Sequence, residues 1–180
     1  MQQLSDLLLD WYDGARRIFP WRAIQDETPD PYRVWLSEIM LQQTGTATVI
    51  SYFNKFTTRW PTVQALAKAP LDEVLTAWAG LGYYARARNL HRCAQIISTE
   101  MNGKFPGNFT ALQKLPGIGP YTAAAITAIA YNEASPVLDG NIERVISRLY
   151  AVTSPLPGSK AELRNLSMAL IDWGRPGDAA

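Results

Sequence analysis

The stretch Leu115-Pro116-Gly117-Ile118-Gly119-Pro120 decides how this chain folds. It lies between a short expected helix at 109–114 and a longer one, rich in small residues, at 120–131. Two glycines allow a tight turn and a close backbone approach, and the Leu and Ile side chains can anchor that turn in a core. The second proline suits the first turn of a helix, where free N–H groups can hold a phosphate oxygen. A plain turn would not require this whole pattern, so we interpret the stretch as a helix-hairpin-helix motif.

The rest of the chain also has the spacing of helices, because apolar residues recur at intervals of three and four rather than two. A first stripe runs from Leu4 to Tyr12, and a second helix can begin at Pro31. Further helices are expected at 46–59, 71–78, 84–100, 120–131, 141–151 and 160–172. Gly and Pro lie between these segments. The sequence therefore predicts an all-α fold with short loops.

Composition limits the possibilities. The 180 residues, 47% of them hydrophobic, suffice for one domain or two small interlocked ones with a real core. No apolar run approaches the ~20 residues of a membrane span, and the first ten residues lack the basic start of a signal peptide. The single cysteine, Cys93, excludes a disulfide or a cysteine-ligated metal site within the chain. These features fit a protein of the reducing cytoplasm.

Charge is distributed unevenly although the net charge is only +1. Residues 51–120 contain eight Lys or Arg and three acidic residues, whereas the other residues contain nine Lys or Arg and thirteen acidic residues. A basic middle segment is what a local surface for a polyanion would need. Chance clustering on a solvated surface explains the same counts.

Glu38 is the first candidate for chemistry. Val34 and Trp35 lie one turn before it and Leu41 lies one turn after it, so its carboxyl group lies on an apolar stripe. Such surroundings disfavour the ionised form and should raise the pKa, as a general acid near neutral pH requires. The alternative is a Glu at the edge of the stripe that reaches solvent or pairs with an Arg.

Asp139 is the second candidate. It precedes Gly140, Asn141 and a clear amphipathic helix, so it can act simply as the N-cap. The helix N-terminus would also keep this carboxylate ionised, which suits stabilisation of a cationic transition state. Enzymes that cleave glycosidic bonds usually use one protonated and one charged carboxyl group. Periodicity does not show whether Glu38 and Asp139 meet.

Weaker signals come from residues 83–88, where tyrosines alternate with Arg86 and Arg88 as on nucleic-acid surfaces. A helix start with a solvated basic face has the same pattern. We expect His91 to be structural and Cys93 to be buried and inert.

Five strings together carry a resemblance that covers essentially the whole chain. They are FPWR at 19–22, VWLSEIMLQQT at 34–44, GLGYYARARNL at 80–90, LPGIGPYT at 115–122 and VLDGNIERV at 137–145. Taken in order, they resemble the MutY-type adenine DNA glycosylases of the helix-hairpin-helix superfamily that includes endonuclease III. The implied fold is a six-helix core at 26–151, with the hairpin at 109–131. Residues 1–25 and 152–180 would form parts of a second, incomplete helical subdomain.

The resemblance implies catalytic roles for four residues. Glu38 matches the acid that protonates adenine at N7, and Asp139 matches the carboxylate that stabilises or bonds to the oxocarbenium-like sugar. Asn141 matches a residue that helps to hold the water and that carboxylate, and Tyr121 matches a tyrosine beside the sugar. Endonuclease III has a nucleophilic Lys where this chain has Tyr121, so no Schiff base can form there and a monofunctional glycosylase is expected.

The resemblance also implies DNA contacts. Trp21 and Arg22 match the edge of the adenine pocket, and Tyr83 matches the wedge at the mismatch. Gln43 and Thr44 match residues inserted near the opposite 8-oxoguanine. The remaining expected DNA contacts come from the basic segment and the hairpin: Arg86, Arg88, Gly117 and Gly119. In the superfamily the hairpin often carries a monovalent cation on its carbonyl groups.

The implied activity is hydrolysis of the N-glycosidic bond of adenine opposite 8-oxoguanine or guanine in base excision repair. A thymine glycosylase for G·T mismatches and a non-catalytic DNA-binding fragment are the alternatives. The expected partner is mismatched or oxidised double-stranded DNA, without a membrane, and we expect a cytoplasmic, nucleoid-associated bacterial monomer.

The chain departs from the family pattern at one end. Family members carry four cysteines for a [4Fe–4S] cluster after the last helix, and most have a further domain that reads 8-oxoguanine. We therefore expect a truncated chain with no protein-bound metal, although a full-length member would hold the cluster.

Overall fold

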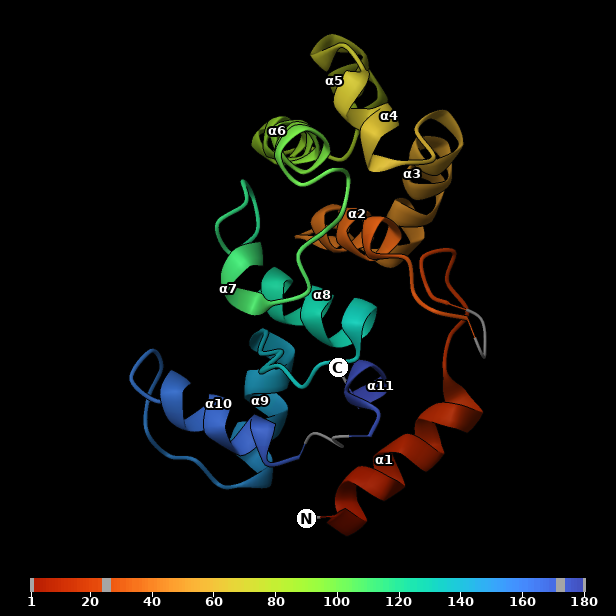
Figure 1. Ribbon diagram of the computed structural model, residues 1–180. Helices are drawn as coiled ribbons and strands as arrows, with labels where there is room; N and C mark the ends of the chain where they lie inside the picture. Colours follow the sequence, from red (N-terminus) through yellow and green to blue (C-terminus); the bar gives the residue numbers. More distant parts are fainter. Residues whose placement is uncertain (1, 24–26, 171–173, 180) are drawn as a thin grey trace.

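Helices are the regular elements of this protein. The computed structural model describes residues 2–23, 27–170 and 174–179, and within these ranges it has eleven helices and no strand. They are α1 (Gln2–Ala15), α2 (Pro31–Leu41), α3 (Thr46–Arg59), α4 (Val63–Lys68), α5 (Leu71–Trp78), α6 (Tyr84–Glu100), α7 (Phe109–Leu112), α8 (Pro120–Tyr131), α9 (Gly140–Leu149), α10 (Lys160–Met168) and α11 (Pro176–Ala179). The predicted all-α fold is confirmed (Figure 1).

Most helix bounds agree with the sequence prediction. Helices α3, α5, α6 and α8 have the predicted bounds, whereas α9 begins one residue earlier and ends two residues earlier than expected. Helix α4 was not predicted, because its six residues make fewer than two turns and the spacing of three between Val63 and Leu66 is not repeated. The side chain of Thr62 caps it by accepting a hydrogen bond from the Ala65 backbone at 3.2 Å. Helix α10 ends at Met168, and part of the predicted extension to 172 lies outside the described residues.

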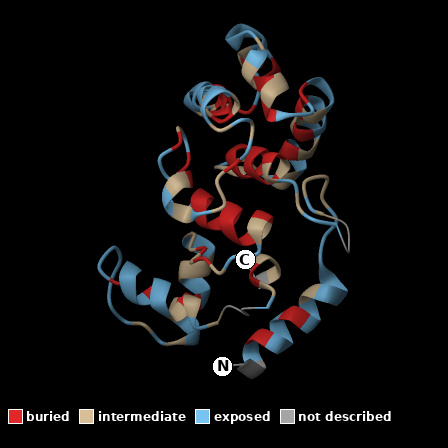
Figure 2. Ribbon diagram, viewed as in Figure 1, coloured by how far each residue is buried: buried red, intermediate tan, exposed pale blue. Residues whose placement is uncertain are grey.

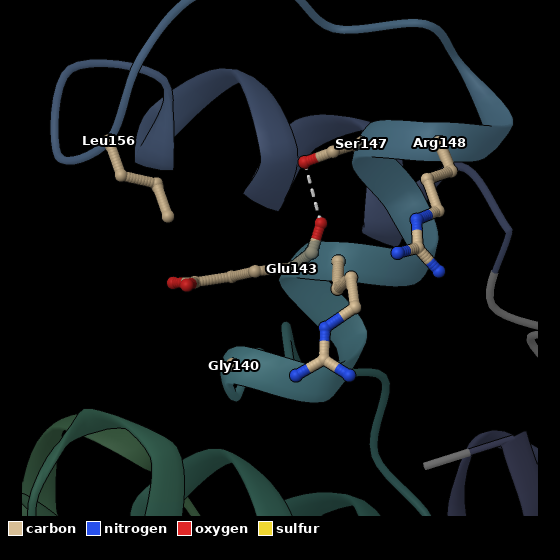
Figure 3. A pocket seen from close by; sticks show the side chains of 6 residues that line it. Gly140, Glu143, Ser147, Arg148 and Leu156 are labelled. Atoms are coloured by element: carbon tan, nitrogen blue, oxygen red, sulfur yellow. Dashed lines mark hydrogen bonds between the residues drawn. The ribbon is translucent and has the colours of Figure 1, made fainter.

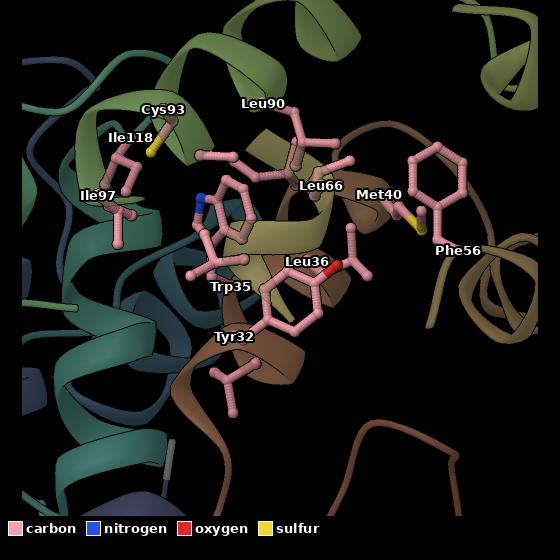
Figure 4. Packing of buried hydrophobic residues seen from close by; sticks show 14 of the residues in the cluster. Tyr32, Trp35, Leu36, Met40, Phe56, Leu66, Leu90, Cys93, Ile97 and Ile118 are labelled. Atoms are coloured by element: carbon pink, nitrogen blue, oxygen red, sulfur yellow. The ribbon is translucent and has the colours of Figure 1, made fainter. Parts of the chain in front are cut away.

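The core forms where α2 packs between α3, α6 and α8, while α4 and α5 pack against α6. Trp35 of α2 and Trp78 of α5 are fully buried there, and the rings of Phe56 in α3 and Trp78 in α5 meet edge to face. Figure 4 shows α2 side chains packed against those of α6 around Leu90. Figure 2 shows α2 and α8 as the most continuously buried helices. The helix that carries Glu38 is therefore held from several sides.

The predicted hairpin joins α7 to α8. Leu115 and Ile118 are buried, as expected for anchors, and Pro120 is the first residue of α8. Gly117 has φ of +78°, a backbone conformation that favours glycine, and an added Cβ there would make a tight contact at 3.0 Å from Asn89. Gly119 has φ of −84° and open space where a Cβ would lie. Only the first glycine is thus needed for the turn itself.

The first and last described helices pack together, since α1 contacts α11, which in turn packs against α8 (Figure 1). The Arg175 guanidinium donates two hydrogen bonds to the Asp13 carboxylate, at 2.6 and 2.9 Å. In the ranges that the structure describes, no helix has both the length and the apolar character needed to cross a membrane.

Candidate active site

Glu38 lies in the buried interior of α2. Asp30 caps this helix by accepting a hydrogen bond from the Tyr32 backbone at 2.9 Å, and Pro31 occupies its first turn. Glu38 is 9% exposed, and the neighbouring Ile39 is 2% exposed. Burial raises the pKa of Glu38 to about 7, because the ionised form loses water that the protein does not fully replace. The carboxyl group on the apolar stripe thus has the raised pKa that the sequence predicts.

Tyr121, in the first turn of α8, interacts with Glu38 across the packing of α2 on α8. Its hydroxyl hydrogen-bonds to the Glu38 carboxyl group and partly offsets the effect of burial on the pKa of Glu38. Burial and the two nearby carboxylates raise the pKa of Tyr121, so the phenol remains protonated and can donate. The close packing of α2 on α8 brings these residues together.

Asp139 is the N-cap of α9, as the sequence predicts. Its carboxylate accepts hydrogen bonds from the backbone N–H groups of Asn141 at 3.0 Å and Ile142 at 2.8 Å. The Asn141 side-chain amide donates a third bond to the other carboxylate oxygen at 3.1 Å. Three donors therefore fix the orientation of this carboxylate.

The charge of Asp139 acts on both Glu38 and Tyr121, and it further raises the pKa of Glu38. Side chains from α2, α8 and the start of α9 therefore share one site. This meeting is the relationship that periodicity left undecided. The arrangement offers a proton donor near neutral pH beside an oriented carboxylate, which suits general acid catalysis with stabilisation of a developing cation.

Gln42 and Thr122 belong to the same region, although the sequence analysis did not single them out. The Gln42 side-chain amide donates a hydrogen bond to the Thr122 hydroxyl at 3.3 Å, and this bond joins the end of α2 to α8. Thr122 directly follows Tyr121 and is 2% exposed. In the sequence, the signal for Thr122 was that a polar residue falls at a position expected to be buried in the helix after the hairpin.

Two exposed tips flank this region of the fold. Gln43 follows α2 and has φ of 55°, and Tyr83 precedes α6 and has φ of 47°. Both lie in the left-handed region, which is uncommon for residues other than glycine. Tyr83 is 66% exposed, and Gln43 and Arg88 are exposed as well. The Arg86 guanidinium lies between the two tips and hydrogen-bonds to both loops.

Trp21 and Arg22 make their contacts around the segment before α2. The Trp21 ring stacks on Phe19 at 4.9 Å between centroids and meets Phe53 edge to face at 5.5 Å. The Arg22 guanidinium lies 5.6 Å from the centroid of Tyr12. These contacts show how the two residues are held, and their place at a base pocket stays a prediction.

A second surface feature lies on α9. A hollow of about 350 Å³ is lined by Gly140, Glu143, Arg144, Ser147, Arg148 and Leu156. Figure 3 shows these lining side chains. Arg144 and Arg148 are exposed and lie one helical turn apart, so α9 presents two cations in the same hollow as Gly140, which directly follows Asp139. The sequence analysis did not name these arginines, and their spacing of four on an amphipathic helix was the available signal.

Cys93 and His91 have structural positions, as predicted. The His91 ring contacts the Ala69 carbonyl at 2.8 Å, and burial raises the pKa of Cys93 to about 12, so its thiolate is disfavoured. A [4Fe–4S] cluster needs four cysteine thiolates, and these 180 residues contain one cysteine. The residues present therefore do not fit such a cluster. Among the described residues, no group of three or more His, Cys, Asp or Glu side chains is arranged to hold a metal ion.

Comparisons with known proteins agree with this geometry. The chain is 45% identical over 179 residues to an adenine DNA glycosylase of Homo sapiens, a match that covers 95% of this chain and 33% of the relative. It is 46% identical over 146 residues to an adenine DNA glycosylase of Buchnera aphidicola subsp. Baizongia pistaciae, with 81% of this chain and 40% of the relative covered. The chain thus spans about a third to two fifths of the length of these relatives.

Solved structures share the fold. A thermostable thymine-DNA glycosylase superposes with a TM-score of 0.84 at 27% identity, covering 98% of this chain and 81% of that one. A trapped endonuclease III–DNA covalent intermediate superposes with a TM-score of 0.78 at 21% identity, covering 99% of this chain and 81% of that one. The family described as "HhH-GPD superfamily base excision DNA repair protein" matches residues 36–169. The chain therefore belongs to the HhH-GPD superfamily of base excision DNA repair proteins.

Proposed function

We propose that this chain carries the catalytic core of a monofunctional DNA glycosylase that removes adenine mispaired with 8-oxoguanine or guanine. The observation that carries the proposal is the meeting of Glu38, Tyr121 and Asp139 in one site. The identity of 41–46% to adenine DNA glycosylases of animals, plants and bacteria supports the choice of adenine.

The two carboxyl groups divide the reaction between them. Glu38, half of it protonated near its pKa of about 7, donates a proton to N7 of adenine. The bond between N9 and the sugar C1′ then breaks, and its electron pair leaves with the neutral base. Asp139 stabilises the positive charge that develops on the sugar ring. Water adds to C1′ and gives a proton to the Glu38 carboxylate, which restores the acid, and Asn141 keeps the Asp139 carboxylate oriented.

Tyr121 supports this chemistry without supplying a nucleophilic amine. Its hydroxyl donates to Glu38 and keeps the pKa of that carboxyl group from rising further. An acid with a pKa near the working pH transfers its proton most effectively, so this hydrogen bond tunes the donor. A phenol cannot form a Schiff base, which is the reason for proposing hydrolysis alone.

DNA binding is the second part of the proposal. Adenine can reach the buried Glu38 only after it leaves the base stack, which costs a few kcal/mol. The exposed Tyr83 ring would act as the wedge at the mismatch, and Gln43 with Thr44 would fill the space on the opposite strand. The open surface at Gly119 lets a phosphate approach the start of α8, and Arg88 adds an exposed cation. We propose that the carbonyl groups of the hairpin bind a monovalent cation. Trp21 and Arg22 would form the edge of the pocket that receives the base.

The proposal includes the organisation of the chain. Residues 26–151 would form the core, in which the structure describes the eight helices α2 to α9 rather than the six expected. Residues 1–25 and 152–180 would belong to a second subdomain, whose parts meet through Arg175 and Asp13. We predict that the protein is monomeric, which size-exclusion chromatography would test. We also predict that it is cytoplasmic and nucleoid-associated, which imaging of a tagged chain would test.

Single-turnover cleavage of four duplexes tests the function. They contain A·8-oxoG, A·G, T·G or thymine glycol, and we expect base release from the first two. Release from T·G alone would favour the thymine glycosylase alternative, which the likeness to the thermostable thymine-DNA glycosylase supports. Tight duplex binding without release from any substrate would favour a non-catalytic DNA-binding module.

A further inference from the structure

Arg86 lies in the first turn of α6, and its side chain reaches the end of α2. Its Nη1 donates to the carbonyl oxygens of Ile39 and Met40, both at 3.1 Å, and to that of Gln42 at 2.6 Å. A cation over the last carbonyls of a helix satisfies acceptors that have no partner within the helix. One nitrogen of Arg86 thus fixes the backbone immediately before Gln43.

The other nitrogen completes a link to the second loop. Nη2 of Arg86 donates to the Thr44 hydroxyl at 3.2 Å, immediately after Gln43. It also donates to the Leu81 carbonyl at 2.8 Å, two residues before Tyr83. The guanidinium carbon lies 5.7 Å from the Tyr83 ring centroid and 5.3 Å from that of the buried Trp78.

These contacts connect the two tips that have left-handed backbone conformations. Such conformations are unfavourable for residues with a side chain, and they persist where surrounding contacts determine them. The contacts of Arg86 bracket Gln43 on both sides and reach the backbone that leads into Tyr83. Its Nε is buried, so the guanidinium is embedded between the loops.

We propose that Arg86 is a positioning residue that couples the Gln43 tip to the Tyr83 tip, so that both enter the DNA duplex as one rigid unit. This inference rests on the proposed function, because the roles of wedge and opposite-strand plug come from it. The sequence predicts a direct DNA contact for Arg86. The structure favours an indirect role, because both terminal nitrogens already bond to protein acceptors.

The test compares Arg86→Lys with Arg92→Lys in the full 180-residue chain. Lys keeps the charge but has one ammonium group, which cannot reproduce the forked geometry of a guanidinium. Arg92 is exposed in the same helix and serves as the matched control. The readouts are single-turnover release of adenine and the fluorescence of 2-aminopurine at the target position, which rises when that base leaves the stack.

We expect Arg86→Lys to lower base release about tenfold, a size typical of coupled neighbouring residues, and to reduce the 2-aminopurine signal. The pH dependence of release should not change, since Glu38 is untouched. In a Tyr83→Ala, Gln43→Ala background, the same substitution should change release by less than about twofold, because the tips through which Arg86 acts are gone.

An equal effect of Arg86→Lys in both backgrounds would overturn the proposal, as would a pH midpoint that moves with the substitution. Arg86→Gln, which keeps the aliphatic stem and one amide donor, repeats the comparison of the two backgrounds with a neutral side chain. Loss of the helical circular dichroism signal in both variants would limit Arg86 to a role in folding and would also overturn it. If the wild-type chain releases no adenine, the proposed function fails, while the 2-aminopurine comparison still tests the coupling of the tips.

Discussion

The hydroxyl of Tyr121 hydrogen-bonds to the carboxyl group of Glu38, and this bond links the first turn of α8 to the interior of α2. It opposes the effect of burial on the pKa of Glu38, whereas the nearby charge of Asp139 adds to that effect. The pKa of about 7 is therefore a balance among three groups from separate helices.

Replacing the acid should remove catalysis and leave DNA binding intact. Glu38→Gln keeps the shape of the side chain but has no carboxyl proton to donate, and loss of general acid catalysis costs about 10²–10⁴ in rate. Single-turnover release from an A·8-oxoG duplex measures the loss, and fluorescence anisotropy measures binding. The exposed Glu100→Gln is the control. Release at the wild-type rate from Glu38→Gln would contradict the assignment of the acid.

The rate of base release should fall as the pH rises through about 7, because only protonated Glu38 can donate. Tyr121→Phe removes the hydrogen bond that lowers the pKa of Glu38, so the midpoint of this decline should move to higher pH. Tyr84→Phe, in the exposed first turn of α6, should leave the midpoint in place. A midpoint that moves to lower pH in Tyr121→Phe would show that the hydroxyl does not stabilise the ionised carboxylate.

The stability of the wild-type protein should also depend on the ionisation of Glu38. Its pKa rises from 4.5 to about 7 on folding, so the protonated carboxyl group contributes stability below 4.5 that is lost as the pH increases to about 7. Glu38→Gln does not ionise and should be more stable than the wild type at pH 8 by up to about 3 kcal/mol. The difference should shrink as the pH falls toward 5. Urea unfolding at both pH values measures it, and equal stability at pH 8 would argue against a buried acid.

Asp139→Asn should abolish most activity and leave the fold intact, because Asn caps a helix about as well as Asp. We expect a loss of rate approaching that of Glu38→Gln, since the neutral amide cannot stabilise positive charge on the sugar. Asp30→Asn changes the N-cap of α2 in the same way and is the matched control. Melting temperature and single-turnover release separate the two roles. Full activity in a stable Asp139→Asn protein would limit Asp139 to capping.

Duplex binding should weaken steeply with salt, because neutralised phosphates release counterions. Affinity should fall at least about tenfold between roughly 50 and 200 mM salt. Arg88→Gln should reduce the slope of the logarithmic plot by about one, whereas Arg16→Gln, outside the basic middle segment, should leave it unchanged. Filter binding across a salt series gives both slopes. An affinity that is constant over this range would contradict a basic DNA-binding surface.

Local patterns were sufficient for much of the fold. The apolar spacing of three and four predicted the bounds of α3, α5, α6 and α8, and the hairpin string predicted the buried anchors Leu115 and Ile118. The same reasoning placed Glu38 on an apolar face and Asp139 at a helix start. These features depend on neighbours within one or two turns, so the sequence contains them directly. Helix α4 was missed because it is too short to repeat its pattern.

The tertiary structure alone decided which residues meet. No spacing in the sequence places Tyr121 against Glu38 or the Asp139 charge beside both. The packing of α2 on α8 and the turn into α9 bring these residues together. Arg86 shows the same limit, because its position between the loop at Gln43 and the loop at Tyr83 depends on where α2 ends relative to α6. The sequence determined the helices and the chemical character of their faces. Packing determined the site, because the pKa of a buried carboxyl group depends on distances across the core that local periodicity does not specify.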